Sequence, residues 1–240
     1  PARIAWGTVD LPGQVFCRRW LLKPGAKLFN PFGEPDQARM NPGNRPDLLK
    51  PVGPVDPQIA FLAIETLDGR PLGLLANYSL HYVGGIPAGG VSADYFGEFA
   101  RLMPTRVRGG TGFVAMMSNG ASGDINNLPF LMRRPPREPG EQIRIVAGKT
   151  ADAAWLAWKK IDDYQSSVRI GMIERRITLA LRRCLNAASK SASASRKRRV
   201  SRSLGTVYGC PSTMRTKFLG FAGVYATAGS TTRTMRPTTS

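Results

Sequence analysis

The chain has 240 residues, 42% of them hydrophobic, and a formal net charge of +18. This length and composition are typical of a soluble globular protein with one substantial core or two small ones. No segment approaches the roughly 18 consecutive apolar residues of a membrane-spanning helix, and the first residues have no signal-peptide pattern.

The positive charge is concentrated at the end of the chain. Residues 175–240 contain 14 Lys or Arg and no Asp or Glu. Residues 1–174 contain 20 Lys or Arg and all 16 acidic side chains, which leaves a net charge of +4. The net charge of residues 1–174 is therefore close to neutral. Any function that depends on the strong positive charge rests on the tail.

The first 57 residues are rich in Pro and Gly and contain only short apolar pieces, such as residues 15–20. We predict that they form loops and short strands on the surface. The three cysteines, Cys17, Cys184 and Cys210, have neither metal-ligand spacing nor the even count of a full disulfide set.

Two apolar runs follow, over residues 59–66 and 71–79. The Asp68-Gly69 pair between them is a strong turn signal, so we predict an antiparallel hairpin. The second run leads directly to His81, the single histidine of the chain. A histidine beside apolar residues is often structural, and this alternative stands beside a role as ligand or catalyst.

A second strand with a polar loop at its end is predicted downstream. Residues 113–117 form a short apolar run, and residues 118–127 are dense in Gly, Asn and Asp. Catalytic groups commonly lie at the ends of strands, so we expect this loop and His81 to share one site. The alternative is that Asn and Asp only satisfy the geometry of a tight turn.

Two helices are predicted around these strands. Ser92 and Asp94 begin the first, with Ser92 placed to cap free backbone N–H groups and Asp94 to oppose the positive end of the helix dipole. The second spans about residues 141–163, where apolar residues recur at three- and four-residue intervals. Alternation over residues 168–181 predicts a further strand or hairpin. The fold class is therefore α/β, a mixed sheet with flanking helices.

From about Cys184 the periodicity stops, and a Ser-, Arg- and Thr-rich basic segment follows. Three interpretations remain open for residues 184–240. They are a basic arm that binds phosphates, a disordered solvated tail, or a sequence translated out of frame, since a run of 66 residues without an acid, 175–240, is unusual. We accordingly divide the chain into a domain of residues 1–183 and an irregular basic tail.

Six short segments, taken in this order, resemble the N-terminal domain family of neutral/alkaline non-lysosomal ceramidases, especially its bacterial branch. They are Arg18-Arg19-Trp20-Leu21-Leu22-Lys23, Phe29-Asn30-Pro31, Gly53-Pro54-Val55-Asp56-Pro57, Asn77-Tyr78-Ser79-Leu80-His81, Ser92-Ala93-Asp94-Tyr95 and Gly123-Asp124-Ile125-Asn126. The resemblance covers about residues 1–183. It implies a zinc-dependent amidase, a hydrolase that cleaves the N-acyl bond of a sphingolipid such as ceramide.

By this resemblance, His81 matches a zinc ligand of the family. A catalytic zinc needs about three protein ligands and an open position for water, and the bound water then attacks the amide carbonyl. The family draws its other ligands from a His-rich motif upstream and from a Glu and a Tyr downstream. This sequence has no such upstream motif, and residues 175–240 contain no Glu, so we expect an internal fragment with an incomplete catalytic domain.

The loop departs from the family pattern at Asn126, where characterised ceramidases have a serine. An amide is no nucleophile, so we assign Asn126 to stabilisation of the oxyanion and Asp124 to orientation of a ligand or of the loop. Gly123 and Tyr82 are assigned to substrate binding.

Three functional hypotheses follow. The first is a ceramidase-like zinc amidohydrolase, incomplete or inactive as this chain, acting on a lipid or other N-acyl amide. The second is a nucleic-acid-binding protein that uses the basic tail, and the third is a non-catalytic lipid- or protein-binding module. The family resemblance suggests secretion or a periplasmic location.

Overall fold

The structure is a computed structural model that describes residues 1–30, 33–169, 171 and 174. The chain forms two compact units, and the first comprises Pro1–Leu28 with Asp36–Ser167. The second comprises Phe29–Pro35 and Val168–Ser240. The elements described below, from β1 to α2, all belong to the first unit.

The main sheet has four strands in the order β1-β6-β7-β8. They are β1 (Ala2–Asp10), β6 (Gln58–Thr66), β7 (Pro71–Tyr78) and β8 (Val114–Asn119). The predicted hairpin is confirmed, because β6 pairs with β7 in antiparallel register and Gly69 in the turn has a φ of 87°. β8 runs parallel to β7, so the ends of these two strands lie at the same edge of the sheet.

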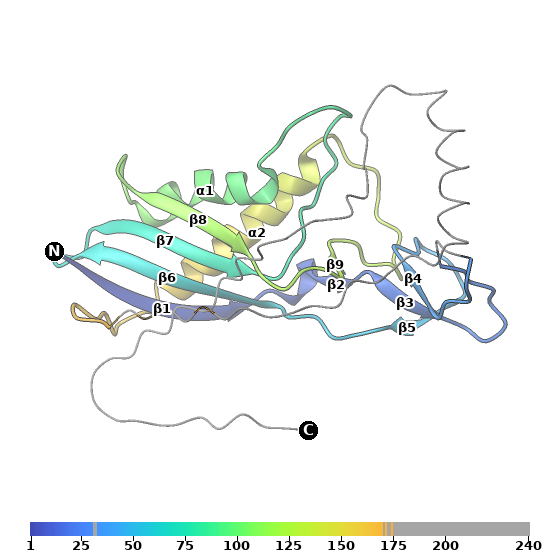
Figure 1. Cartoon of the computed structure of the whole chain (residues 1–240). Helices are drawn as coiled ribbons and strands as arrows, with labels where there is room; N and C mark the ends of the chain where they lie inside the picture. Colours follow the sequence, from blue (N-terminus) through green and yellow to red (C-terminus); the bar gives the residue numbers. More distant parts are fainter. Residues whose placement is uncertain (31–32, 170, 172–173, 175–240) are drawn as a thin grey trace. The chain divides into compact units, whose positions relative to one another are not determined.

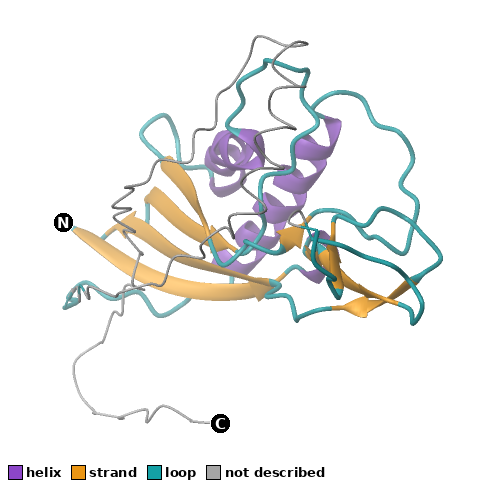
Figure 2. Cartoon of the chain, turned by 45° about the vertical axis from the view of Figure 1, so that its right-hand side comes forward, coloured by secondary structure: helices purple, strands orange, loops and turns teal. Residues whose placement is uncertain are grey.

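Two helices pack against one face of this sheet (Figures 1 and 2). Helix α1 (Asp94–Val107) connects β7 to β8, and α2 (Glu141–Trp158) packs on α1. A parallel strand pair needs such a crossover, and a helix supplies it here. The predicted mixed α/β fold is confirmed.

The core lies between the helices and the sheet. On β6, Ile59, Phe61 and Ala63 are buried in alternation, as one face of a strand requires. Phe99 of α1 and Val146 of α2 are fully buried against that face. The predicted start of α2 is correct, but the helix ends at Trp158 rather than near residue 163. After it the chain returns to the sheet, where Gln165 pairs with Ile4.

The beginning of the chain differs from the prediction. Residues 2–10 form the long strand β1, which pairs with the whole of β6, whereas we predicted loops and short strands over residues 1–57. β1 lies beside a single partner strand and is only partly buried, so its apolar alternation is weak. Pairing with β6, rather than local pattern, accounts for the strand.

The following elements are short, as predicted. They are a 3-10 turn (Pro12–Gln14), β2 (Phe16–Cys17), β3 (Arg19–Leu22), β4 (Ala38–Met40) and β5 (Leu48–Pro51), with β9 (Ile125–Asn126) later in the chain. β3 pairs with β4 and β5, and β2 pairs with β9. Trp20, Leu48 and Phe130 form a small second core.

In the second unit, the described residues include a short turn. Phe29 and Pro35 form an isolated β-bridge, and Asn30 donates a hydrogen bond to the Glu34 carboxylate at 2.9 Å. Most of the strand or hairpin predicted over residues 168–181, and the whole predicted tail of residues 184–240, lie outside the described residues. Of the helices that the structure describes, none has the length and apolar character to cross a membrane.

Candidate functional site

A cavity of about 230 Å³ is lined by residues that follow β7 and β8, and we call it the His81 cavity. Its lining consists of His81, Tyr82 and Val83 after β7, Asn126, Asn127 and Leu128 beyond β8, and Arg18, Asn41, Arg134 and Gln142 from other segments. Ligands of α/β proteins commonly bind beyond the carboxyl ends of parallel strands. This cavity is therefore the candidate site.

His81 lies three residues beyond the end of β7. Its imidazole is partly buried, and its ring centroid is 4.1 Å from that of Tyr82. The Nδ1 atom lies 3.4 Å from the Tyr82 carbonyl oxygen, at the long end of hydrogen-bond distance. The ring therefore borders the cavity and is held only weakly by its own neighbours.

The loop after His81 is held by Asp94, the first residue of α1. The Asp94 carboxylate accepts hydrogen bonds from the backbone N–H groups of Val83 and Gly84, each at 2.8 Å, and of Tyr95 at 2.7 Å. Asp94 is buried, and its φ of 54° lies in the left-handed region, which Asp tolerates better than most residues. Asp94 thus joins the His81 loop to the start of α1, beyond its predicted role toward the helix dipole.

Tyr95 and Ser92 complete this connection. The Tyr95 hydroxyl donates a hydrogen bond to the Leu80 carbonyl at 2.8 Å, one residue before His81. Burial raises the pKa of Tyr95 well above its ordinary value, so the phenol stays a donor. Ser92 Oγ accepts from the Asp94 N–H at 2.9 Å. The start of α1 therefore holds the chain on both sides of His81.

The loop after β8 is fixed by long-range pairing. β9 places Asn126 opposite Phe16, and the backbone oxygens of Gly123 and Asp124 accept from Arg18 Nη2 at 2.6 Å and from Arg18 N at 2.7 Å. Asn126 Nδ2 donates to Asn41 Oδ1 at 3.0 Å, and its Oδ1 accepts from the Asn127 N–H at 2.7 Å. These bonds fix Asn126 at the cavity and leave one hydrogen of its side-chain amide without a hydrogen bond to the described residues.

Asn127 is the centre of the polar network. It is buried, and its Nδ2 donates to the Gln14 carbonyl at 2.7 Å. Its Oδ1 accepts from Arg134 Nη1 at 3.0 Å and from Gln142 Nε2. Burial and the neighbouring Arg137 lower the pKa of Arg134 from its ordinary value. One buried amide therefore positions two side chains of the cavity wall.

Two buried polar atoms of the cavity residues have no hydrogen-bond partner among the described residues, namely Arg18 Nε and Gln142 Oε1. A buried donor or acceptor without a partner costs about 1–3 kcal/mol. Native proteins leave few such groups, and each calls for an explanation. Both atoms are covered from solvent, so a ligand in the cavity that accepts from one and donates to the other reaches them only when the side chains around them move.

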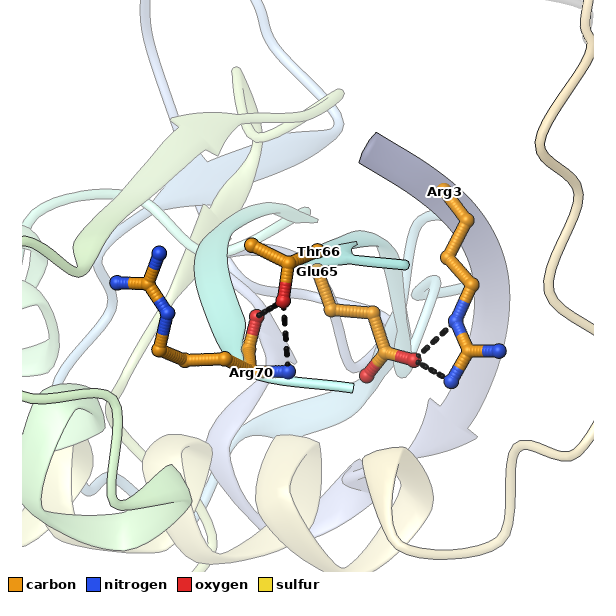
Figure 3. A network of polar contacts seen from close by, with 4 residues as sticks. All are labelled: Arg3, Glu65, Thr66 and Arg70. Carbon is orange, nitrogen blue, oxygen red and sulfur yellow. Dashed lines mark hydrogen bonds and ion pairs between the residues drawn. The ribbon is translucent and has the colours of Figure 1, made fainter. Parts of the chain in front are cut away.

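A second cavity, of about 400 Å³, includes Arg3 of β1, Glu65 of β6 and Tyr164 in its lining. The Arg3 guanidinium forms an ion pair with the buried Glu65 carboxylate, with Nε to Oε1 at 2.6 Å, and Thr66 and Arg70 hydrogen-bond across the adjoining turn (Figure 3). Because Glu65 is already paired, this cavity is less suited to a polar ligand than the His81 cavity.

Tyr164 beside this ion pair leads to a prediction on pH. Burial, followed by the charge of Glu65, raises the pKa of Tyr164 to about 12 from 10.0. Its contribution to stability should be complete below pH 10 and lost as the pH rises toward 12, because the unfolded state loses this proton first. Urea unfolding at pH 9, 10 and 11 should show a steeper decline for the wild type than for Tyr164→Phe. Parallel declines would contradict the assignment.

The described residues do not fit the zinc ion that the sequence resemblance implies. Among residues 1–30, 33–169, 171 and 174, no group of three or more His, Cys, Asp or Glu side chains is arranged to hold a metal. His81 provides one imidazole, and the neighbouring Asp94 carboxylate is occupied by backbone N–H groups. A catalytic zinc needs about three protein ligands.

The structure brings three of the predicted site residues together, because His81, Tyr82 and Asn126 line one cavity. Gly123 and Asp124 accept hydrogen bonds from Arg18 through their backbone oxygens and are not part of the lining. The functional roles assigned to these five residues stay predictions.

Sequence reasoning did not assign Arg18, Asn41, Asn127, Arg134 or Gln142 to the site. The only local signals were the polar loop around Asn127 and the position of Arg18 in one of the family-like segments. Asn41, Arg134 and Gln142 carry no such signal, since each reaches the cavity through long-range contacts.

No family model and no curated protein matches the chain. Among solved structures, the neutral ceramidase from Pseudomonas aeruginosa is similar, with 16% identity, a TM-score of 0.46 and coverage of 71% of this chain and 25% of that one. A ceramidase complexed with C2 gives 15% identity, a TM-score of 0.49 and coverage of 71% and 24%. The chain spans about a quarter of these proteins, and both are ceramidases, the family that the sequence motifs resemble.

Proposed function

We propose that this chain carries the polar part of the substrate site of a ceramidase-like hydrolase that acts on N-acyl amides. The observation that carries the proposal is that two residues of the His81 cavity wall, Arg18 and Gln142, each hold a buried atom without a partner among the described residues, the donor Nε and the acceptor Oε1. A ligand pairs with them once neighbouring side chains move to expose them. An amide group has one carbonyl acceptor and one N–H donor, which match this pair. The ordered motifs of the sequence add independent support.

In this proposal, the residues around the cavity have separate roles. Arg18 donates to the amide carbonyl oxygen, and Gln142 accepts from the amide N–H. The free amide hydrogen of Asn126 is available to the oxyanion that develops when water adds to the carbonyl. The His81 imidazole can take a proton from that water and return it to the leaving amine. No step is assigned to zinc, because the described residues do not form a site for it.

The test is to titrate the full chain with N-octanoylethanolamine by isothermal calorimetry and to follow octanoate release by mass spectrometry, with added zinc and with EDTA. Loss of one hydrogen bond in Gln142→Ala should weaken binding by about tenfold. Gln37→Ala, an exposed glutamine outside the cavity, is the matched control and should leave binding unchanged.

The outcomes separate the remaining hypotheses. Binding that depends on Gln142, with octanoate release that His81→Ala abolishes, supports the hydrolase. Binding without release in either metal condition identifies a non-catalytic lipid-binding module. Equal ligand affinities of Gln142→Ala and Gln37→Ala would contradict the proposed recognition of the amide group by Gln142.

A further inference from the structure

The His81 cavity is unusual in its charge. Two guanidinium groups, of Arg18 and Arg134, belong to its lining, and none of the described lining residues is an Asp or Glu. Both side chains donate hydrogen bonds to neutral oxygens, Arg18 to Gly123 O and Arg134 to Asn127 Oδ1. In the described part of the chain, the ion pairs involve other arginines: Arg3, Arg45, Arg101, Arg106 and Arg137.

Acidic residues beside the cavity segments do not pair with these two cations. Glu141, which precedes Gln142, forms an ion pair with Arg137 at 3.7 Å. The Asp94 carboxylate is taken up by three backbone N–H groups of the His81 loop and α1. Asp124 approaches Arg18 through its backbone oxygen. Partly buried cations without a counter-charge are costly, and an anion in the cavity relieves that cost. Arginine is also the side chain best suited to hold a carboxylate with two parallel hydrogen bonds.

Part of the exposed lining of the same cavity is apolar. Tyr82 and Leu128 belong to the lining, yet 62% and 45% of their surfaces are exposed. Leu131 and Met132 follow Leu128 in the same loop and are also exposed. Apolar side chains beside a polar cavity favour a ligand with a hydrocarbon chain next to its polar head. The cavity thus combines partly buried cations with exposed apolar side chains.

We propose that the His81 cavity binds the carboxylate of an alkyl-chain amphiphile, with the carboxylate paired to Arg18 and Arg134 and the chain lying on Tyr82 and Leu128. This inference rests on the proposed function and defines its substrate class. Two sources supply the same chemistry. One is an N-acyl amino acid, whose carboxylate belongs to the substrate, and the other is the fatty acid that amide hydrolysis releases.

Three ligands of equal chain length distinguish these sources in calorimetric titrations of the full chain, namely N-octanoylglycine, octanoate and N-octanoylethanolamine. At low salt the carboxylates should bind about tenfold more tightly than the neutral amide, and added salt should reduce the difference. Tighter binding of N-octanoylglycine than of octanoate identifies a substrate carboxylate. Equal affinities of these two identify a site for the acid product.

The mutational test uses Arg134→Gln, with Arg133→Gln as its matched control. Arg133 is the exposed neighbour in the same loop and does not line the cavity. Arg134→Gln should weaken carboxylate binding about tenfold and leave the neutral amide nearly unchanged. Arg134→Lys keeps the positive charge but not the planar guanidinium. Its affinity for the carboxylate should therefore lie between those of the wild type and Arg134→Gln. Circular dichroism melting curves establish that each variant is folded.

The inference is overturned if the neutral amide binds as tightly as N-octanoylglycine, or if Arg134→Gln behaves like Arg133→Gln. The first result leaves the proposed function intact, because the amide group would then be recognised without a charge. Conversely, tight octanoate binding with no binding of either amide would keep the carboxylate site and contradict the proposed function. The two proposals therefore fail in different experiments.

Discussion

Replacement of Asp94 by alanine is expected to lower the free energy of unfolding by about 3 kcal/mol. The change removes the acceptor of three backbone N–H groups, those of Val83, Gly84 and Tyr95, which lie 2.7–2.8 Å from the carboxylate oxygens. Alanine also tolerates the left-handed backbone at this position poorly. Urea unfolding followed by circular dichroism measures the loss.

Two further variants separate the loss of the hydrogen bonds from the backbone strain and from the loss of an aspartate charge. Asp94→Asn tolerates the same backbone conformation and keeps one oxygen acceptor, so a smaller loss of about 1–2 kcal/mol is expected. Asp152→Asn is the control for loss of an aspartate charge at the surface. Asp152 pairs with Arg106 on an exposed part of the two helices, and such pairs contribute about 0–1 kcal/mol. A loss for Asp94→Ala no larger than for Asp152→Asn would contradict the role of Asp94.

The Asp94 variants also report on the site. Because the carboxylate holds Val83 and Gly84, its loss releases the segment that carries His81 and Tyr82. Ligand affinity at the His81 cavity should therefore fall in the variants that remain folded. An unchanged affinity would mean that the loop keeps its position without Asp94.

The second large effect is expected at Asn127. Asn127→Ala should destabilise the protein by about 3 kcal/mol, because it leaves the Gln14 carbonyl, Arg134 and Gln142 without their buried partner. It should also weaken ligand binding by more than about tenfold, since two side chains of the cavity wall lose their common anchor. Urea unfolding and calorimetric titration with N-octanoylglycine measure the two effects.

Asn127→Asp tests the effect of a negative charge at this position. An aspartate still accepts from Arg134 and Gln142, but it cannot donate to Gln14 and brings a negative charge beside Arg134. We expect its carboxylate to compete with a carboxylate ligand and to affect a neutral amide less. Asn119→Ala, an exposed asparagine at the end of β8, should change neither stability nor binding. Similar losses for Asn119→Ala and Asn127→Ala would contradict the role of Asn127.

The elements that the sequence predicted well are those with strong local signals. The Asp68-Gly69 turn and the apolar runs beside it determine the β6–β7 hairpin, and a helical repeat of apolar residues marks α2. β1 was missed because an edge strand with mixed burial has little alternation, and its paired residues on β6 lie 48 to 64 positions further along the chain. Local patterns carry no information on such a partner.

In the candidate site, too, the residues with local sequence signals were predicted and those placed by long-range contacts were not. The sequence by itself determined that His81 and the polar loop around Asn126 each follow a strand, because apolar runs and Gly-rich loops are readable locally. Only the tertiary structure decided that Arg18, Arg134 and Gln142 join them. β2–β9 pairing, the Asn127 amide and the start of α2 bring these side chains together. The character of the cavity, cationic and with unpaired buried atoms, arises from this convergence of distant segments and therefore has no counterpart in any single stretch of the sequence.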